Sequence, residues 1–90
     1  MKLPRDVSGE SLAQALRSFG YQVTRQTGSH LRLTTTESGE HHVTIPRHDP
    51  LRIGTFAAIL DDVAAHFELS RAELLTHLTR YERKGVDFPA

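Results

Sequence analysis

The sequence predicts a two-layer α+β fold, in which two main helices cover one face of a three-stranded antiparallel sheet and leave the other face open. Three observations lead to this expectation. Apolar residues keep helical spacing over residues 9–19, three short segments rich in β-forming residues fill residues 21–45, and helical spacing returns from residue 55. The chain has 90 residues and no cysteine, so we expect one domain whose modest core forms without disulfides or a thiolate metal site.

The first helix is expected over residues 9–19. Ser8 can cap its first turn, and Leu12, Leu16 and Phe19 follow at helical spacing. Gly20 stands where a glycine in the left-handed conformation commonly ends a helix.

Three strands are expected next, over residues 21–26, 29–36 and 40–45. Gly28 lies in the break between the first two, and Pro46 ends the third because it has no N–H to donate to a ladder.

The faces of the side chains determine the register of the second hairpin. Leu31 and Leu33 should share the core side with Val43 and Ile45, so odd positions must pair with odd positions and Leu31 must face Ile45. This parity predicts a three-residue loop over residues 37–39, with its glycine in the left-handed conformation. The open face then holds the even positions, namely His30, Arg32, Thr34, His42 and Thr44, and His30 lies near Pro46 and hence near Arg47 and His48.

Two further helices complete the expected chain. Thr55 can cap a helix with one apolar stripe, and Asp61 and Asp62 point outward from it. Ser70 and Glu73 form a capping box between the staple residues Leu69 and Leu74, which starts a last helix. The apolar residues of the two helices are Phe56, Ile59, Leu60, Val63 and Phe67 in one, and Leu74, Leu75, Leu78 and Tyr81 in the other. We expect the domain core to span about residues 6–78 and a short tail to span residues 79–90.

Composition limits the classes of function. The N-terminus lacks the apolar segment of a signal peptide and no long apolar run follows, so we expect a cytoplasmic protein without membrane contact. Eleven basic and eleven acidic residues cancel, so a nucleic-acid site would have to be a local patch.

Four of the six histidines fall between residues 30 and 48. Each could be an ordinary polar surface residue. A metal site is the second interpretation, but His41 and His42 are adjacent on a strand and point to opposite faces, so we expect no metal and no cofactor. Acid–base work on RNA is the third, because imidazole exchanges protons near neutral pH and cations such as Arg32 or Arg47 can offset charge that develops on the phosphate.

Short motifs follow one another in a fixed order over residues 28–33, 43–48, 53–56 and 59–60. Together they resemble the HicA (YcfA-like) toxin family, and the resemblance spans about residues 6–78. It implies a fold like that of a double-stranded-RNA-binding domain, with an extra C-terminal helix. It also implies an mRNA interferase of a type II toxin–antitoxin system, which a HicB-type antitoxin neutralises in a toxin–antitoxin hetero-oligomer. The essential histidine of the family falls on His30, Gly28 and Ser29 shape the approach to it, and His48 matches a further family histidine. Many relatives carry a second histidine where this chain has Leu31.

The sequence therefore predicts a metal-independent endoribonuclease with His30 as general acid or base. His42 or His48 is expected to supply the complementary proton transfer. The residues expected to support catalysis or bind RNA are Gly28, Ser29, Arg32, His42, Arg47 and His48. Two alternatives remain: a non-catalytic RNA-binding module, and an inactive protein that keeps only an antitoxin-binding surface around Asp61 and Asp62.

Overall fold

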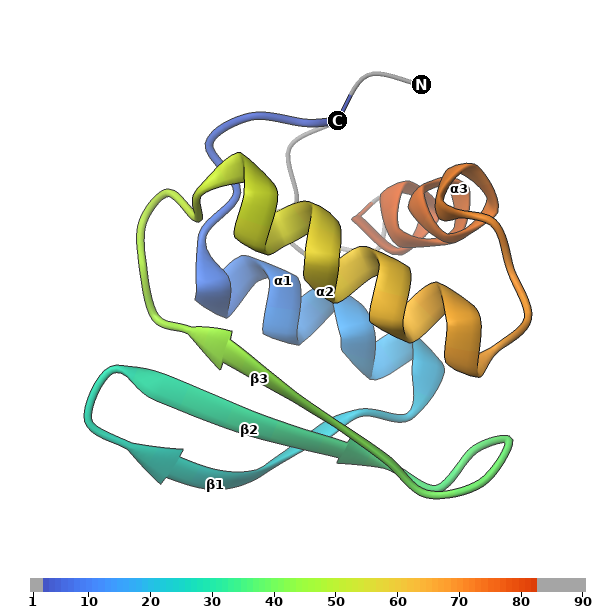
Figure 1. Ribbon diagram of the computed structural model, residues 1–90, viewed down its shortest axis with the longest axis horizontal. Helices are drawn as coiled ribbons and strands as arrows, with labels where there is room; N and C mark the ends of the chain where they lie inside the picture. Colours follow the sequence, from blue (N-terminus) through green and yellow to red (C-terminus); the bar gives the residue numbers. More distant parts are fainter. Residues whose placement is uncertain (1–2, 83–90) are drawn as a thin grey trace.

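The computed structural model describes the backbone of residues 3–82 and the side chains of residues 3–79. The helices lie on one side of a three-stranded antiparallel sheet of order β1-β2-β3, which confirms the predicted α+β fold (Figure 1). None of the helices in this part of the chain is long and apolar enough to cross a membrane.

The first helix has the predicted extent, but its last turn is tighter. The α-helix α1 spans Gly9–Ala15 and continues as the 3₁₀ helix η1 over Leu16–Phe19. The Ser8 hydroxyl oxygen accepts a hydrogen bond from the Ser11 N–H at 3.0 Å, which caps α1 as predicted. Gly20 has a φ of 82°, the left-handed conformation expected after the last turn.

The three strands lie within one residue of their predicted positions: β1 spans Gln22–Thr27, β2 spans His30–Thr35 and β3 spans His41–Pro46. Leu31 pairs with Ile45, as the parity argument predicted.

The loop between β2 and β3 is longer than predicted. The last pair joins Thr35 to His41, so five residues rather than three lie between the strands. Thr35 causes this early end, because its hydroxyl donates to the Phe19 carbonyl at 2.8 Å and accepts from the Glu37 N–H at 3.1 Å. Ser38 has a positive φ of 57°, which was not predicted, beside the expected positive φ at Gly39.

The strand β1 is an edge that the helices do not cover. All six of its side chains are exposed, including Val23 at 50 %. Figure 1 shows why, since α1 and α2 lie over β3 and β2 while β1 extends beyond them. The alternation of residues 21–26 therefore predicted the strand correctly, but it did not indicate that every side chain of β1 is exposed.

The helix α2 spans Ile53–His66 and begins two residues before the predicted cap. Thr55 does not cap it. The N-cap is Arg52, which makes no side-chain capping bond, and the Phe56 N–H donates to the Arg52 carbonyl at 2.9 Å. Gly54 accounts for the wrong prediction, because a glycine suggests a loop but costs only about 1 kcal/mol within a helix.

The last helix, α3, spans Arg71–Glu82. Its capping box is formed as predicted: the Ser70 N–H donates to Glu73 Oε1 at 2.9 Å, and the Glu73 N–H donates to Ser70 Oγ at 3.0 Å. The Tyr81 side chain and the tail after residue 82 lie outside the described residues.

The core lies between the sheet and the helices. The predicted stripe of α2 is buried except for Phe67, which packs partly buried against the core. The largest fully buried side chains are Tyr21, Phe56, Leu12, Leu16, Leu33, Ile45, Leu60, Leu74 and Leu78.

Candidate functional site

The sheet face that points away from the helices carries polar and basic side chains. We call it the open face. On β2 the exposed residues His30 and Arg32 alternate with the buried Leu31 and Leu33, as predicted. Cross-strand pairing adds residues of β1 and β3, and Thr24 joins them through its hydroxyl contact with Thr34. The open face thus consists of Gln22, Thr24, Arg25, Thr27, His30, Arg32, Thr34, His42 and Thr44.

His30 is the first residue of β2, directly after the turn that holds Gly28 and Ser29. It pairs with Thr27 on one side and with Pro46 on the other. Its Nδ1 lies 3.4 Å from Ser29 Oγ, which is too long for a strong hydrogen bond. Its Nε2 has no hydrogen-bond partner among the described residues. The imidazole of His30 is therefore exposed and available to a ligand.

A backbone contact fixes the loop after β3 beside this turn. The Arg47 N–H donates to the Ser29 carbonyl at 2.6 Å, and the Gly9 N–H donates to the His48 carbonyl at 2.9 Å. Gly9 is required for this approach, because a Cβ there would collide with the Pro46 carbonyl oxygen. The turn before β2, the end of β3 and the start of α1 consequently meet at one end of the sheet.

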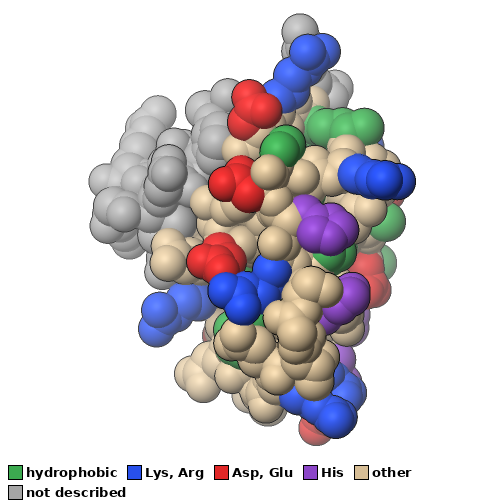
Figure 2. All heavy atoms as spheres, turned by 90° about the vertical axis from the view of Figure 1, so that its left-hand side faces the viewer, with side chains coloured by type: hydrophobic (Ala, Val, Ile, Leu, Met, Phe, Trp, Pro, Cys, Tyr) green, Lys and Arg blue, Asp and Glu red, His purple; other side chains and the backbone are tan. Residues whose placement is uncertain are grey.

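Arg47 and His48 face a shallow hollow at that end, of about 190 Å³, which is lined by Ser8, Glu10, Arg47, His48 and Asp49. Arg47 donates from Nε at 3.0 Å and from Nη2 at 2.7 Å to Glu10 Oε1. Its charge is thus partly compensated within the chain. Figure 2, which views this end of the molecule, shows histidine, basic and acidic side chains gathered on one surface.

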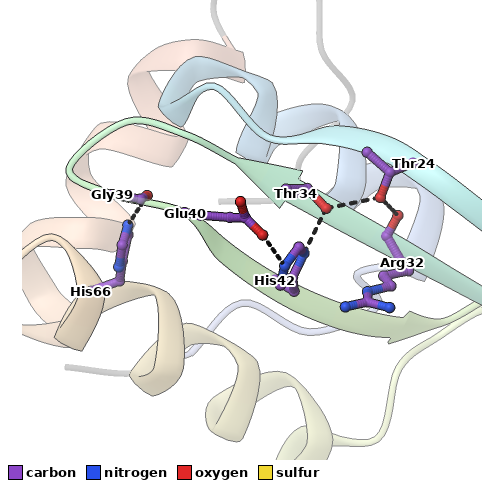
Figure 3. Close-up of polar contacts among 7 residues, drawn as sticks. All are labelled: Thr24, Arg32, Thr34, Gly39, Glu40, His42 and His66. Atoms are coloured by element: carbon purple, nitrogen blue, oxygen red, sulfur yellow. Dashed lines mark hydrogen bonds and ion pairs between the residues drawn. The ribbon is translucent and has the colours of Figure 1, made fainter.

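His42 lies on the same face as His30 but far from it. His42 pairs with Thr34, four residues along β2 from His30, which corresponds to about 13 Å at 3.3 Å per residue. The His42 imidazole instead belongs to a hydrogen-bonded row across the three strands (Figure 3). In this row His42 Nε2 lies 2.8 Å from Glu40 Oε2, its Nδ1 lies 2.7 Å from Thr34 Oγ1, and Thr34 Oγ1 lies 2.8 Å from Thr24 Oγ1.

His41 points toward the helices, as predicted, and forms a cluster that the sequence did not reveal. Its Nδ1 lies 2.6 Å from the Tyr21 hydroxyl and its Nε2 lies 3.1 Å from Asp62 Oδ1. Burial raises the pKa of the Tyr21 hydroxyl well above its usual value, and the negative charge of Asp62 raises it further. The hydroxyl therefore stays protonated and donates to His41 Nδ1.

His66 of α2 completes this cluster. Its ring stacks on that of His41, with centroids 4.4 Å apart and planes at 13°. Its Nε2 lies 2.9 Å from the Glu37 carbonyl oxygen and 3.1 Å from that of Gly39, so it donates to both. Figure 3 shows the contact with Gly39. His41 and His66 thus hold the β2–β3 loop against α2, at the end of the sheet opposite to His30.

The two aspartates of α2 are exposed, as predicted, but both are engaged within the chain. Asp61 accepts from Arg71 Nε at 2.7 Å and from Nη2 at 2.6 Å, and these hydrogen bonds lower the pKa of the Asp61 carboxyl. Asp62 contacts His41. An interaction with a partner through either carboxylate would have to compete with these contacts.

The geometry divides the predicted site residues into two groups. Gly28, Ser29, His30, Arg47 and His48 meet at one end of the sheet, and Arg32 lies two residues from His30 on the open face. His42 lies apart from them. Among residues 3–79, no group of three or more histidine, aspartate or glutamate side chains is arranged to hold a metal ion.

The chain was compared with known protein families, curated proteins and solved structures. The model of a family described as the HicA toxin of bacterial toxin–antitoxin systems matches residues 9–64. No curated protein and no solved structure matches the chain. The matched region contains α1, the whole sheet and nearly all of α2, and therefore every residue of the open face, while α3 lies outside it.

Proposed function

The chain belongs to the HicA family of toxins of bacterial toxin–antitoxin systems, and from this membership we propose that it is an endoribonuclease that cleaves mRNA with His30. One observation carries the proposal: His30 is exposed at the end of the sheet, and no described residue forms a hydrogen bond with its Nε2. An imidazole that takes part in proton transfer must be free to reach the substrate. The family match assigns the toxin role, and the ribonuclease activity and the role of His30 are our proposal.

The proposed reaction uses the 2′-hydroxyl of RNA as nucleophile. A base removes the hydroxyl proton, the oxygen attacks the adjacent phosphorus, and the 5′-oxygen of the next nucleotide leaves with a proton from an acid. The products are a 2′,3′-cyclic phosphate and a 5′-hydroxyl. The guanidinium of Arg32, two residues from His30 on β2, adds positive charge beside the reacting phosphate without binding it directly. The reaction needs no cofactor.

His48 is the better candidate for the second proton transfer. A distance of about 13 Å along β2 separates His42 from His30, too far for both to act on one phosphate. His48 follows the residue whose N–H binds the Ser29 carbonyl, so its backbone is fixed beside the turn that precedes His30. Arg47 is a weaker candidate for charge stabilisation than Arg32, because Glu10 already binds its guanidinium.

The test compares cleavage of a defined mRNA by the parent, by His30→Gln and by His77→Gln, each with and without a metal chelator. His77 is a matched control because it is also an exposed histidine, but lies on α3 among the helices. We expect cleavage by the parent and by His77→Gln, regardless of chelator, and none by folded His30→Gln. Cleavage by His30→Gln at the parental rate would contradict the assignment, and RNA binding without any product would favour the non-catalytic RNA-binding module.

We also propose that a HicB-type antitoxin neutralises this toxin by covering the end of the sheet that holds His30. Expression of the chain alone in bacteria should arrest growth, and co-expression of the antitoxin should restore it and yield a hetero-oligomer on purification. Arrest by His30→Gln as strong as that by the parent would show that growth inhibition has another cause.

A further inference from the structure

Two arginines face each other across the open face. Arg25 of β1 is the direct cross-strand partner of Arg32 of β2, and both side chains are exposed. Residues paired in this way present their side chains on the same face with their Cβ atoms about 5 Å apart, and like charges in such a pair destabilise a sheet. The pairing therefore places two like charges beside each other on the open face.

A β-bulge creates the contact. Val23 pairs with Leu33, and in a regular ladder Arg25 would then pair with Leu31 and point to the helix side. The register shifts between Val23 and Arg25, so Arg25 instead pairs with Arg32 on the open face. The same shift places Thr27 opposite His30. Bulges commonly change the direction of side chains next to functional sites. This bulge brings a second cation, Arg25, onto the open face near His30.

No described carboxylate compensates the two charges. Among the arginines whose side chains the structure describes, those in ion pairs are Arg47, with Glu10, and Arg71, with Asp61. The carboxylate of Glu40, which joins the row on the open face, is bonded to His42. Figure 3 shows the Arg32 guanidinium on this face without a contact to the other residues drawn. Both guanidinium groups are thus available to an external anion.

We propose that Arg25 and Arg32 together bind a backbone phosphate of single-stranded RNA, one step along the strand from the phosphate at His30. Guanidinium groups match phosphate oxygens with paired hydrogen bonds, and a bound phosphate removes the repulsion between the two arginines. His30 and Arg32 are two residues apart on β2, about 7 Å, so adjacent phosphates of one strand can reach both. The inference rests on the proposed function for its ligand, RNA, and is independent of which residue cleaves it.

Binding of a 2′-O-methyl RNA oligonucleotide, which lacks the attacking hydroxyl, tests the proposal. Fluorescence anisotropy would give the dissociation constant at several salt concentrations for the parent, for Arg25→Gln and for Arg17→Gln. Arg17 is the matched control, an exposed arginine on η1 in the helix layer. We expect Arg25→Gln to bind about fivefold more weakly at low salt, and its slope of log affinity against log salt to fall by about 0.7. Arg17→Gln should keep the parental slope.

Thermal unfolding supplies a second readout that needs no ligand. Because Arg25→Gln removes a repulsive pair, it should raise the melting temperature by a few degrees at low salt, and this gain should vanish at about 1 M salt, where charges are screened within about 3 Å. A melting temperature unchanged at low salt would contradict the repulsion on which the proposal depends.

The outcomes separate this inference from the proposed cleavage. Arg25-dependent binding without any cleavage would support the phosphate site and refute the ribonuclease proposal. Cleavage that depends on His30, together with a parental salt slope in Arg25→Gln, would leave the ribonuclease proposal intact and overturn the phosphate site. Absence of RNA binding by the parent would also overturn it, and would leave an acidic surface of a protein partner as the ligand that fits the two arginines.

Discussion

Replacing Tyr21 with phenylalanine tests the cluster that joins the β2–β3 loop to α2. Tyr21 is fully buried, and its hydroxyl lies 2.6 Å from His41 Nδ1. The phenylalanine ring fills nearly the same space, so the main change at neutral pH is the loss of one hydrogen bond. We expect this loss to lower the free energy of unfolding by about 1 kcal/mol, and the melting temperature by about 4–8 °C.

The effect should disappear in alkaline solution. The pKa of the Tyr21 hydroxyl is raised in the folded protein by burial and by Asp62, from an ordinary value of 10.0 that the unfolded chain retains. Above pH 10 the unfolded chain therefore releases a proton that the folded protein keeps, so the stability that Tyr21 contributes is present below pH 10 and falls as pH rises. The loss is about 1.4 kcal/mol per pH unit. The parent and Tyr21→Phe should thus have similar stability near pH 11.

Urea unfolding followed by circular dichroism, at intervals from pH 7 to pH 11, would measure both effects. Every other alkaline titration is common to the two proteins and cancels in the difference between their free energies of unfolding. A difference that stays constant across this range would refute the reasoning, since it would mean that Tyr21 titrates alike in the folded and unfolded chain.

Three further substitutions test the elements that support the site. Ser70→Ala removes the hydroxyl that caps α3 and should lower the free energy of unfolding by about 1 kcal/mol in urea titrations, whereas Ser70→Asp should restore it. Gly9→Ala places a Cβ against the Pro46 carbonyl oxygen, so we expect the free energy of unfolding to fall by about 1–3 kcal/mol in the same assay. The amide NMR signals of Arg47 and His48 should also shift, and unchanged signals there would contradict the contact. Leu33→Ala leaves a cavity at a fully buried position of β2 and should lower the free energy of unfolding by about 2–5 kcal/mol, measurable as a large fall in melting temperature. A decrease below about 1 kcal/mol would show that this position is not in the core.

Local sequence patterns predicted much of the fold because they reflect local physics. Ser8 and Ser70 cap their helices through contacts within three residues, and the alternation around Leu31 and Leu33 determines the register with β3. The β2–β3 loop differed from the prediction because Thr35 bonds to Phe19, sixteen residues away in the sequence. A local pattern contains no information about such a contact.

The candidate site shows the same division. The predicted face and the proximity of His30 to Pro46 are confirmed, since both follow from strand parity. The separation of His42 from His30 also follows from the register, but it requires counting along the ladder rather than assigning faces. The pairing of Arg25 with Arg32 could not be predicted, because a single bulge in β1 decides which face Arg25 occupies.

The histidines can be ordered by how firmly the protein engages them, and this order supports His30 as the reactive residue. His41 and His66 form a stacked and hydrogen-bonded pair, and both nitrogens of His42 are bound. An imidazole engaged in this way must give up its contacts before it can transfer a proton to or from a ligand. Among the described histidines of the sheet, His30 has only a long contact to Ser29, so its reaction with a substrate costs the fold the least. The histidines that stabilise the fold lie toward the β2–β3 loop, whereas His30 lies at the other end of the sheet, beside the loop after β3 that carries His48.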